Sequence, residues 1–156
     1  MLINKQKGSD FFLAEMLLDI ELESDSPIKD YCGSCTKCVD ACPTDAILPQ
    51  RQIDSGKCIS YLTIELRDEI LPSEFKGKME NWAFGCDICQ DVCPWNRFGV
   101  QNEEIEFQPK MDLLQMSKEE WDDLDREEFN RIFQKSAVKR TKFTGLKRNL
   151  SFLQQT

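Results

Sequence analysis

The chain has 156 residues and a formal net charge of −8, from 20 basic and 28 acidic side chains. This length suits one domain or one and a half, and the negative charge is not that of a globally basic nucleic-acid binder. Eight cysteines, no recognisable signal peptide and no hydrophobic segment long enough to span a bilayer favour a protein of the reducing cytoplasm that does not enter a membrane.

The first predicted element is a strand over residues 11–22, where apolar residues alternate at Leu18, Ile20 and Leu22. The acidic, turn-forming segment 23–27 then marks a boundary, and no partner strand follows it. We therefore expect this strand to belong to a sheet that is encoded elsewhere.

Two cysteine runs come next, each ending in Cys-Pro. The first is Cys32, Cys35, Cys38 and Cys42, and the second is Cys58, Cys86, Cys89 and Cys93. This is the ligand pattern of two 4Fe-4S clusters, in which the fourth cysteine of a run binds the other cluster. We therefore expect Cys32, Cys35, Cys38 and Cys93 to hold cluster 1, and Cys42, Cys58, Cys86 and Cys89 to hold cluster 2.

Zinc and disulfide bonds are the alternatives to iron–sulfur clusters. Four-cysteine zinc sites also use C-x2-C pairs, but they rarely need a third cysteine at the same spacing or a proline after the last one. Disulfides belong to an oxidising compartment, for which the sequence gives no sign. The absence of histidine excludes Rieske-type ligation.

Short helices are predicted within and between the cysteine runs. We expect a helical turn at 44–47, a helix over 54–66 and a further helical stretch at 72–81. The insertion 59–85, which separates the first two cysteines of the second run, is too long to be a simple loop.

Beyond the clusters, two capping boxes predict two short helices. They are Ser117-x-x-Glu120 and Asp125-x-x-Glu128. Each is followed by aromatic and aliphatic residues at helical spacing, which we expect to pack together rather than to bind a cofactor. A further amphipathic helix is predicted from Leu146.

The basic tail, residues 135–156, contrasts with the acidic chain before it. It carries Lys135, Lys139, Arg140, Lys142, Lys147 and Arg148 and no acidic residue. Such a tail is typical of contact with a phosphate backbone. The alternative is a solvated face that complements the acidic segment 103–128.

Three segments that contain all eight cysteines, residues 31–47, 58–65 and 82–96, closely resemble epoxyqueuosine reductase. The resemblance extends to Gly8-Ser9 near the start of the chain and, more weakly, to Val138-Lys139-Arg140 near its end. The resemblance implies reduction of epoxyqueuosine to queuosine in tRNA. The two clusters would then pass electrons from a reduced flavodoxin or ferredoxin to the cobalt of cobalamin.

Members of this family carry a cobalamin-binding domain before the cluster domain, and many add helical repeats after it. The resemblance therefore implies that residues 1–26 are the leftover edge of a missing cobalamin domain, 27–100 the double 4Fe-4S domain and 101–156 a truncated helical tail. We expect an α+β fold in which a ferredoxin-like cluster domain lies between a leftover strand and a small helical region.

The resemblance also implies that no catalytic residue lies in this chain, because the family's acid belongs to the cobalamin domain. We expect the chain alone to be inactive and to need a cobalamin domain in cis or in trans. It is then a truncated gene product or half of a split enzyme. The alternatives are a free-standing two-cluster ferredoxin-type electron carrier and a tRNA-contacting module with purely structural clusters.

Tyr61, Thr63 and Glu65 match a family stretch inside the insertion. They either line the cofactor or substrate side or pack the insertion, and the sequence leaves both interpretations open.

Overall fold

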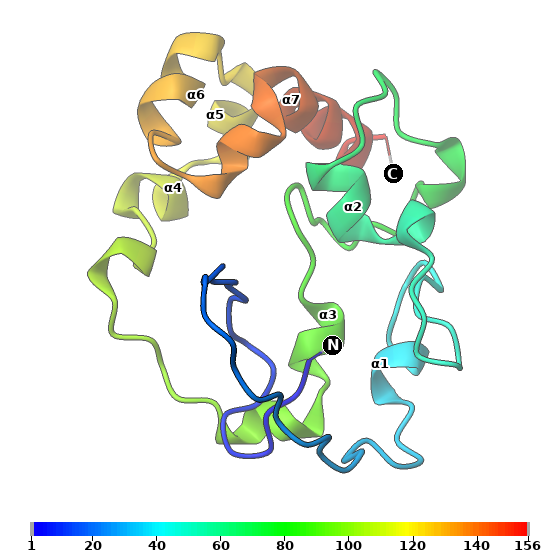
Figure 1. Ribbon diagram of the computed structural model, residues 1–156. Coiled ribbons are helices and arrows are strands. Elements are labelled where there is room, and N and C mark those ends of the chain that lie inside the picture. Colours follow the sequence, from blue (N-terminus) through cyan, green and yellow to red (C-terminus); the bar gives the residue numbers. More distant parts are fainter. Residues whose placement is uncertain (1, 156) are drawn as a thin grey trace.

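The computed structural model describes residues 2–155, which form short helices joined by turns and irregular segments (Figure 1). The α-helices are α1 (Lys37–Asp40), α2 (Ile59–Ile64), α3 (Ile88–Asp91), α4 (Met111–Gln115), α5 (Lys118–Asp123), α6 (Arg126–Ile132) and α7 (Lys142–Leu153). The 3-10 helices are η1 (Ser55–Lys57), η2 (Ser73–Phe75), η3 (Pro94–Phe98), η4 (Ile105–Phe107) and η5 (Ala137–Arg140). Within residues 2–155, none of these helices has the length and apolarity needed to cross a bilayer.

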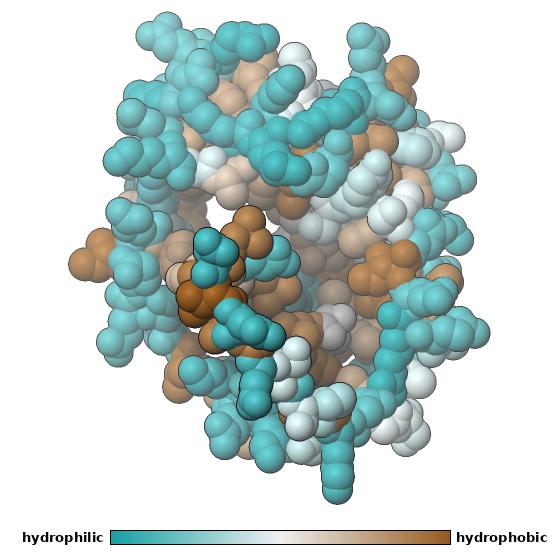
Figure 2. Space-filling model, in the orientation of Figure 1, coloured by the Kyte–Doolittle hydropathy of each residue, from teal (hydrophilic) through white to brown (hydrophobic). Residues whose placement is uncertain are grey.

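The strand expected over residues 11–22 does not form in the described chain. The segment is irregular and exposed, to 95% at Leu17 and 86% at Phe12. A strand needs a neighbour to satisfy its N–H and C=O groups, and residues 2–155 contain only two isolated bridges. Figure 2 shows the apolar side chains gathered over this N-terminal segment. The α+β class is thus not confirmed, because the described fold is helical without a sheet.

The helices predicted within and between the cysteine runs form only in part. The segment 54–66 is helical but is interrupted at Cys58, whose φ and ψ of −70° and 122° separate η1 from α2. The stretch 72–81 forms one short 3-10 helix and then turns. Residues 44–47 form turns and a bridge instead of a helical turn, since Asp45 has a φ of +53° that a right-handed helix cannot accommodate.

The predicted helices of the tail are present. The Ser117 hydroxyl accepts the Glu120 N–H at 3.2 Å, and the Glu120 carboxylate accepts the Ser117 N–H at 2.7 Å, which completes a capping box before α5. Asp125 accepts the Glu128 N–H at 2.8 Å and caps α6. The helix predicted from Leu146 is α7, which starts one turn earlier.

Helix α7 contributes to two hydrophobic cores. The first core contains Ile59, Leu62, Leu71, Phe75, Met79 and Phe152, and the second contains Leu124, Phe129, Ile132, Phe133 and Leu146. Phe152 and Leu146, 5% and 2% exposed, are the α7 residues in these cores. The tail therefore packs against the insertion that follows Cys58 as well as against α5 and α6 (Figure 1).

Candidate metal centre

The two cysteine loops have matching backbone conformations. Helix α1 begins two residues after Cys35, and α3 begins two residues after Cys86. The residues that precede these helices, Thr36 and Asp87, have φ and ψ of −118° and 6° and of −112° and 7°. In each loop the carbonyl of that residue accepts two N–H groups of the next turn. Because α1 and α3 pack against each other, two copies of one motif lie side by side.

The second loop lacks one cysteine of the first. Cys35, Cys38 and Cys42 correspond to Cys86, Cys89 and Cys93. Ala83 occupies the position that corresponds to Cys32. Cys58 is the remaining cysteine, and it sits immediately before α2, at the start of the insertion. In the predicted division of ligands, Cys58 takes the place of this missing local cysteine.

The cysteines predicted for cluster 1 differ in exposure. Burial raises the pKa of the Cys32 thiol, and the neighbouring Cys93 and Cys38 thiols add to the rise. Cys93 is buried at 7% exposure, whereas Cys35 is exposed. Three members of this set are thus electrostatic neighbours, and the fourth lies at the surface.

The cysteines predicted for cluster 2 are also electrostatic neighbours. Burial raises the pKa of Cys86, with further contributions from Cys58 and Cys42. Burial raises the pKa of Cys89 to about 11, with contributions from Cys86, Cys58 and also Cys38. A thiol held at such a pKa binds metal as thiolate only because the positive charge of the metal compensates its burial.

The Cys42 sulfur accepts hydrogen bonds from the residues that follow it in the sequence. It accepts the Ala46 N–H at 3.3 Å and lies 3.7 Å from the Thr44 hydroxyl. Burial alone would raise the pKa of this thiol, but hydrogen bonds from the Thr44, Ala46 and Ile47 backbone outweigh it and lower the pKa below its usual value. The non-helical turn at 44–47 thus supplies backbone N–H groups that favour the thiolate form of Cys42.

The thiols are not gathered around one point. Within residues 2–155, no three cysteine, aspartate or glutamate side chains converge closely enough to hold a single metal ion. A cubane distributes its four thiolates over four irons, so its ligands stand farther apart than those of one ion. The thiolate donors and the two cysteine loops fit such clusters, and the division of the eight ligands between them stays a prediction.

Arg51 holds the first cysteine loop from outside. Its guanidinium contacts the Asp30 carboxylate at 2.5 Å and donates to the Gly33 carbonyl at 2.7 Å. Asp30 in turn accepts the Cys32 N–H at 2.9 Å, and the hydrogen bond from Arg51 lowers the pKa of this carboxyl. Sequence reasoning missed Arg51, because no spacing rule relates it to the cysteines. Gly33 has a φ of +54°, which explains the glycine in this turn.

The N-terminal segment is fastened to the loop that follows Cys93. The Ser9 N–H donates to the Asn96 side-chain oxygen at 2.6 Å, and the Ser9 hydroxyl contacts the Gln90 side chain. The Asn96 amide also donates to the Gln90 carbonyl at 2.8 Å. Gly8 has a φ of +86°, and a side chain there would clash with Asn96. The Gly8-Ser9 pair thus serves to dock this segment.

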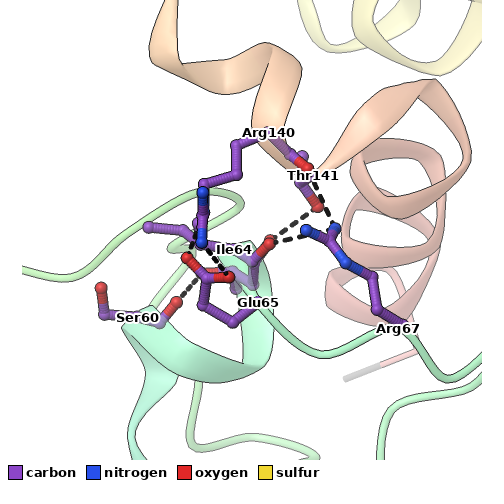
Figure 3. A network of polar contacts seen from close by, with 7 residues as sticks. Ser60, Ile64, Glu65, Arg67, Arg140 and Thr141 are labelled. Atoms are coloured by element: carbon purple, nitrogen blue, oxygen red, sulfur yellow. Dashed lines mark hydrogen bonds and ion pairs between the residues drawn. The ribbon is translucent and has the colours of Figure 1, made fainter.

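Most cations of the basic tail bind acceptors within the protein. Arg140 pairs with Glu65, and Arg67 donates to the Arg140 carbonyl at 2.9 Å (Figure 3). Further contacts join Arg148 to the carbonyls of Leu62, Leu66 and Asp68, Lys147 to the carbonyl of Asp122, and Lys139 to the side chain of Asn130. None of the side-chain hydrogen bonds and ion pairs found within residues 2–155 involves Lys135 or Lys142.

Of the three insertion residues singled out in the sequence, Thr63 is fully buried and Glu65 pairs with the tail, whereas Tyr61 is 38% exposed. Thr63 and Glu65 therefore pack the insertion against the tail. Their contacts depend on Thr141 and Arg140, far away in the sequence.

Residues 31–96 match a family model described as a 4Fe-4S double cluster binding domain. The chain thus carries the site of two 4Fe-4S clusters. It is also 58% identical over 154 residues to an epoxyqueuosine reductase from Leadbetterella byssophila, covering 99% of this chain and 50% of that relative. This chain is a homologue of part of the epoxyqueuosine reductases. It spans about half the length of the curated relatives it matches.

Solved structures of epoxyqueuosine reductases share this fold. The structure of the Bacillus subtilis enzyme superposes with a TM-score of 0.82 at 33% identity and covers 98% of this chain and 41% of that one. A crystal structure of an epoxyqueuosine reductase with an epoxyqueuosine-modified tRNA-Tyr stem loop gives a TM-score of 0.68 at 33% identity, covering 84% of this chain and 34% of that one. The resemblance found in the sequence is therefore confirmed over nearly the whole chain.

Proposed function

We propose that this chain is the iron–sulfur electron-relay portion of an epoxyqueuosine reductase and acts with a cobalamin domain in cis or in trans. Residues 27–100 would form the cluster domain and residues 101–156 its helical tail. The exposed apolar segment within residues 1–26 would adjoin the cobalamin domain. Together the two parts would reduce epoxyqueuosine to queuosine in tRNA.

The observation that carries the proposal is the similarity to a protein named epoxyqueuosine reductase, which is 58% identical to this chain over 99% of its length. All eight cysteines lie inside the matched region. Clusters of this type, when bound, transfer electrons one at a time. The chain's own residues hold them through thiolates, lower the pKa of Cys42 through backbone N–H groups and place Cys35 at the surface. An exposed ligand supports electron entry at cluster 1 from a reduced flavodoxin or ferredoxin.

The proposal is tested by recombining this chain with the part of the Leadbetterella byssophila relative that it does not match. Both are purified without oxygen, the chain is reconstituted with iron and sulfide, and cobalamin is added to the other part. Epoxyqueuosine-containing tRNA and a strong chemical reductant then start the reaction, and mass spectrometry of the digested tRNA counts queuosine. We expect queuosine only when both parts are present.

The matched control is the same mixture with Cys89→Ser, which we expect to lose the activity while keeping the partner loaded with cobalamin. Absence of turnover with a cobalamin-loaded complex and intact clusters overturns the proposal. If the reconstituted chain instead stays monomeric, forms no complex and exchanges electrons with other redox proteins, it is a free-standing two-cluster carrier.

We also propose that the basic tail touches tRNA through Lys135 and Lys142, since the other tail cations bind acceptors within the protein. In the recombined enzyme, replacing both lysines with glutamine should weaken tRNA binding and reduce the slope of its salt dependence by about 1 to 2. Lys118→Gln, outside the tail, is the control. Equal slopes in all variants would assign the tail to packing alone.

A further inference from the structure

The insertion 59–85 poses a geometric problem for cluster 2. Cys58 precedes the insertion and Cys86 follows it, so both ends have to be held together for the two thiols to serve one cluster. Closing a flexible loop of this length costs conformational entropy. Residues that join the two ends therefore determine whether the ligands are preorganised.

Asn149 of α7 joins the two ends of the insertion. Its side-chain amide donates to the carbonyls of Thr63 and Ala83, both at 2.9 Å. The side chain is 1% exposed, and its oxygen accepts the guanidinium of Arg148 at 2.9 and 3.1 Å. Since every hydrogen-bonding atom of this buried amide is used, its geometry is strongly specified.

Thr63 continues this connection to the ligand itself. Its side chain is fully buried, and its hydroxyl donates to the Ile59 carbonyl at 2.7 Å. The same hydroxyl accepts the N–H of Gly85 at 3.0 Å. Gly85 has a φ of +76° and directly precedes Cys86. One hydroxyl thus ties the first turn of α2, next to Cys58, to the residue next to Cys86.

We infer that Thr63 and Asn149 are positioning residues for cluster 2, which fix the distance between Cys58 and Cys86 across the insertion. The inference rests on the assignment of these cysteines to one cluster and does not depend on turnover of tRNA. It gives α7 a role in the metal centre although the helix contains no ligand. The three cluster 1 cysteines of the first loop lie outside this connection, and Arg51 and Asp30 hold that loop instead.

The test compares Thr63→Val with Thr63→Ser in the full chain, reconstituted without oxygen. Valine keeps the shape of threonine but removes the hydroxyl, whereas serine keeps the hydroxyl. Iron release to a chelator and the midpoint potential of each cluster, followed by electron paramagnetic resonance, are the measurements. Cys35→Ser and Cys89→Ser identify the signal of each cluster.

We expect Thr63→Val to release the iron of cluster 2 about tenfold faster and to shift its potential, because the Gly85 N–H loses its buried partner. Thr63→Ser should restore both values, and cluster 1 should remain unchanged. Thr141→Val is the matched control. It removes a hydrogen bond of 2.9 Å to the Thr63 carbonyl without touching Gly85, so a smaller effect on cluster 2 is expected.

Asn149→Ala provides a second variant if Thr63→Val does not fold, with circular dichroism to confirm that the helices persist. Selective loss of cluster 2 in this folded variant supports the inference. Equal loss of both clusters, no change in cluster 2, or effects of Thr63→Ser and Thr141→Val as large as that of Thr63→Val would overturn it. Such results leave the proposed function untouched, since they concern only how cluster 2 is held.

Discussion

Asp30 and Arg51 form an ion pair at 2.5 Å beside the first cysteine loop, although both side chains are about half exposed. Arg51 also interacts electrostatically with the Cys32 and Cys38 thiols. Its charge therefore lies within reach of cluster 1, which becomes more negative when it is reduced.

Arg51→Gln should lower the midpoint potential of cluster 1, because a nearby positive charge favours the reduced state. The expected shift is on the order of tens of millivolts and should diminish at high salt. Spectroelectrochemistry of the reconstituted chain measures it. Arg131→Gln, which breaks an ion pair in α6, is the control. A rise in potential, or an equal shift in the control, would contradict the role given to Arg51.

The predicted division of ligands implies that a substitution in one cysteine loop can damage the cluster held mainly by the other loop. Cys42→Ser should damage the cluster held by Cys58, Cys86 and Cys89 more than the cluster of its own loop. Iron and sulfide analysis combined with electron paramagnetic resonance measures which cluster is lost. Cys38→Ser should show the opposite selectivity. Loss of only the cluster held by the first three cysteines in Cys42→Ser would refute the division.

Gly8→Ala should release the N-terminal segment from the loop after Cys93. Alanine at a φ of +86° costs about 1 kcal/mol, and its Cβ would also meet the Asn96 backbone at 3.1 Å. Hydrogen exchange at Ser9 should accelerate, and proteolysis between residues 11 and 22 should become faster. Gly77→Ala measures the cost of the positive φ alone, since Gly77 has a φ of +75° and no atom within 4 Å of the added Cβ. A loss of stability in Gly8→Ala no larger than that in Gly77→Ala would leave the Asn96 contact without a role.

The Glu65–Arg140 pair should stabilise the docking of the tail only above a certain pH. The hydrogen bond from Arg140 lowers the pKa of Glu65, so the stabilisation is fully present above the unfolded value of about 4.3 and is lost as the pH falls through the lower folded value. The difference in urea midpoint between the natural chain and Glu65→Gln should therefore shrink on acidification. Acid also releases clusters from both proteins, so the difference between the curves reports the pair. A constant difference down to pH 3 would contradict this.

The cysteine spacing and the capping boxes were readable in the sequence because both are local patterns. Ser117 and Asp125 cap the helices that their spacing predicts. Local patterns also misled: alternating apolar residues at 11–22 indicate a strand, but a strand needs a partner that the described residues do not contain. The periodicity of apolar residues is a property of one segment, whereas a sheet forms only when several segments pair with one another.

Long-range polar contacts could not be predicted in the same way. Arg51 contacts Gly33, and Asn149 contacts Thr63 and Ala83, across sequence separations that no motif records. The sequence predicted that the basic tail could bind phosphate, because its charged residues can be identified in the sequence. The carbonyl acceptors of Arg148 are invisible there, since every residue has a carbonyl.

Helix α7 lies in both hydrophobic cores and begins well after Cys93, the last cysteine. If Asn149 holds the second loop as proposed, all eight thiols leave the ribosome before the helix that preorganises four of them. Cluster 2 is then completed only after translation has passed Asn149. During that interval the exposed thiols require a reducing environment or a protein that delivers the clusters after synthesis.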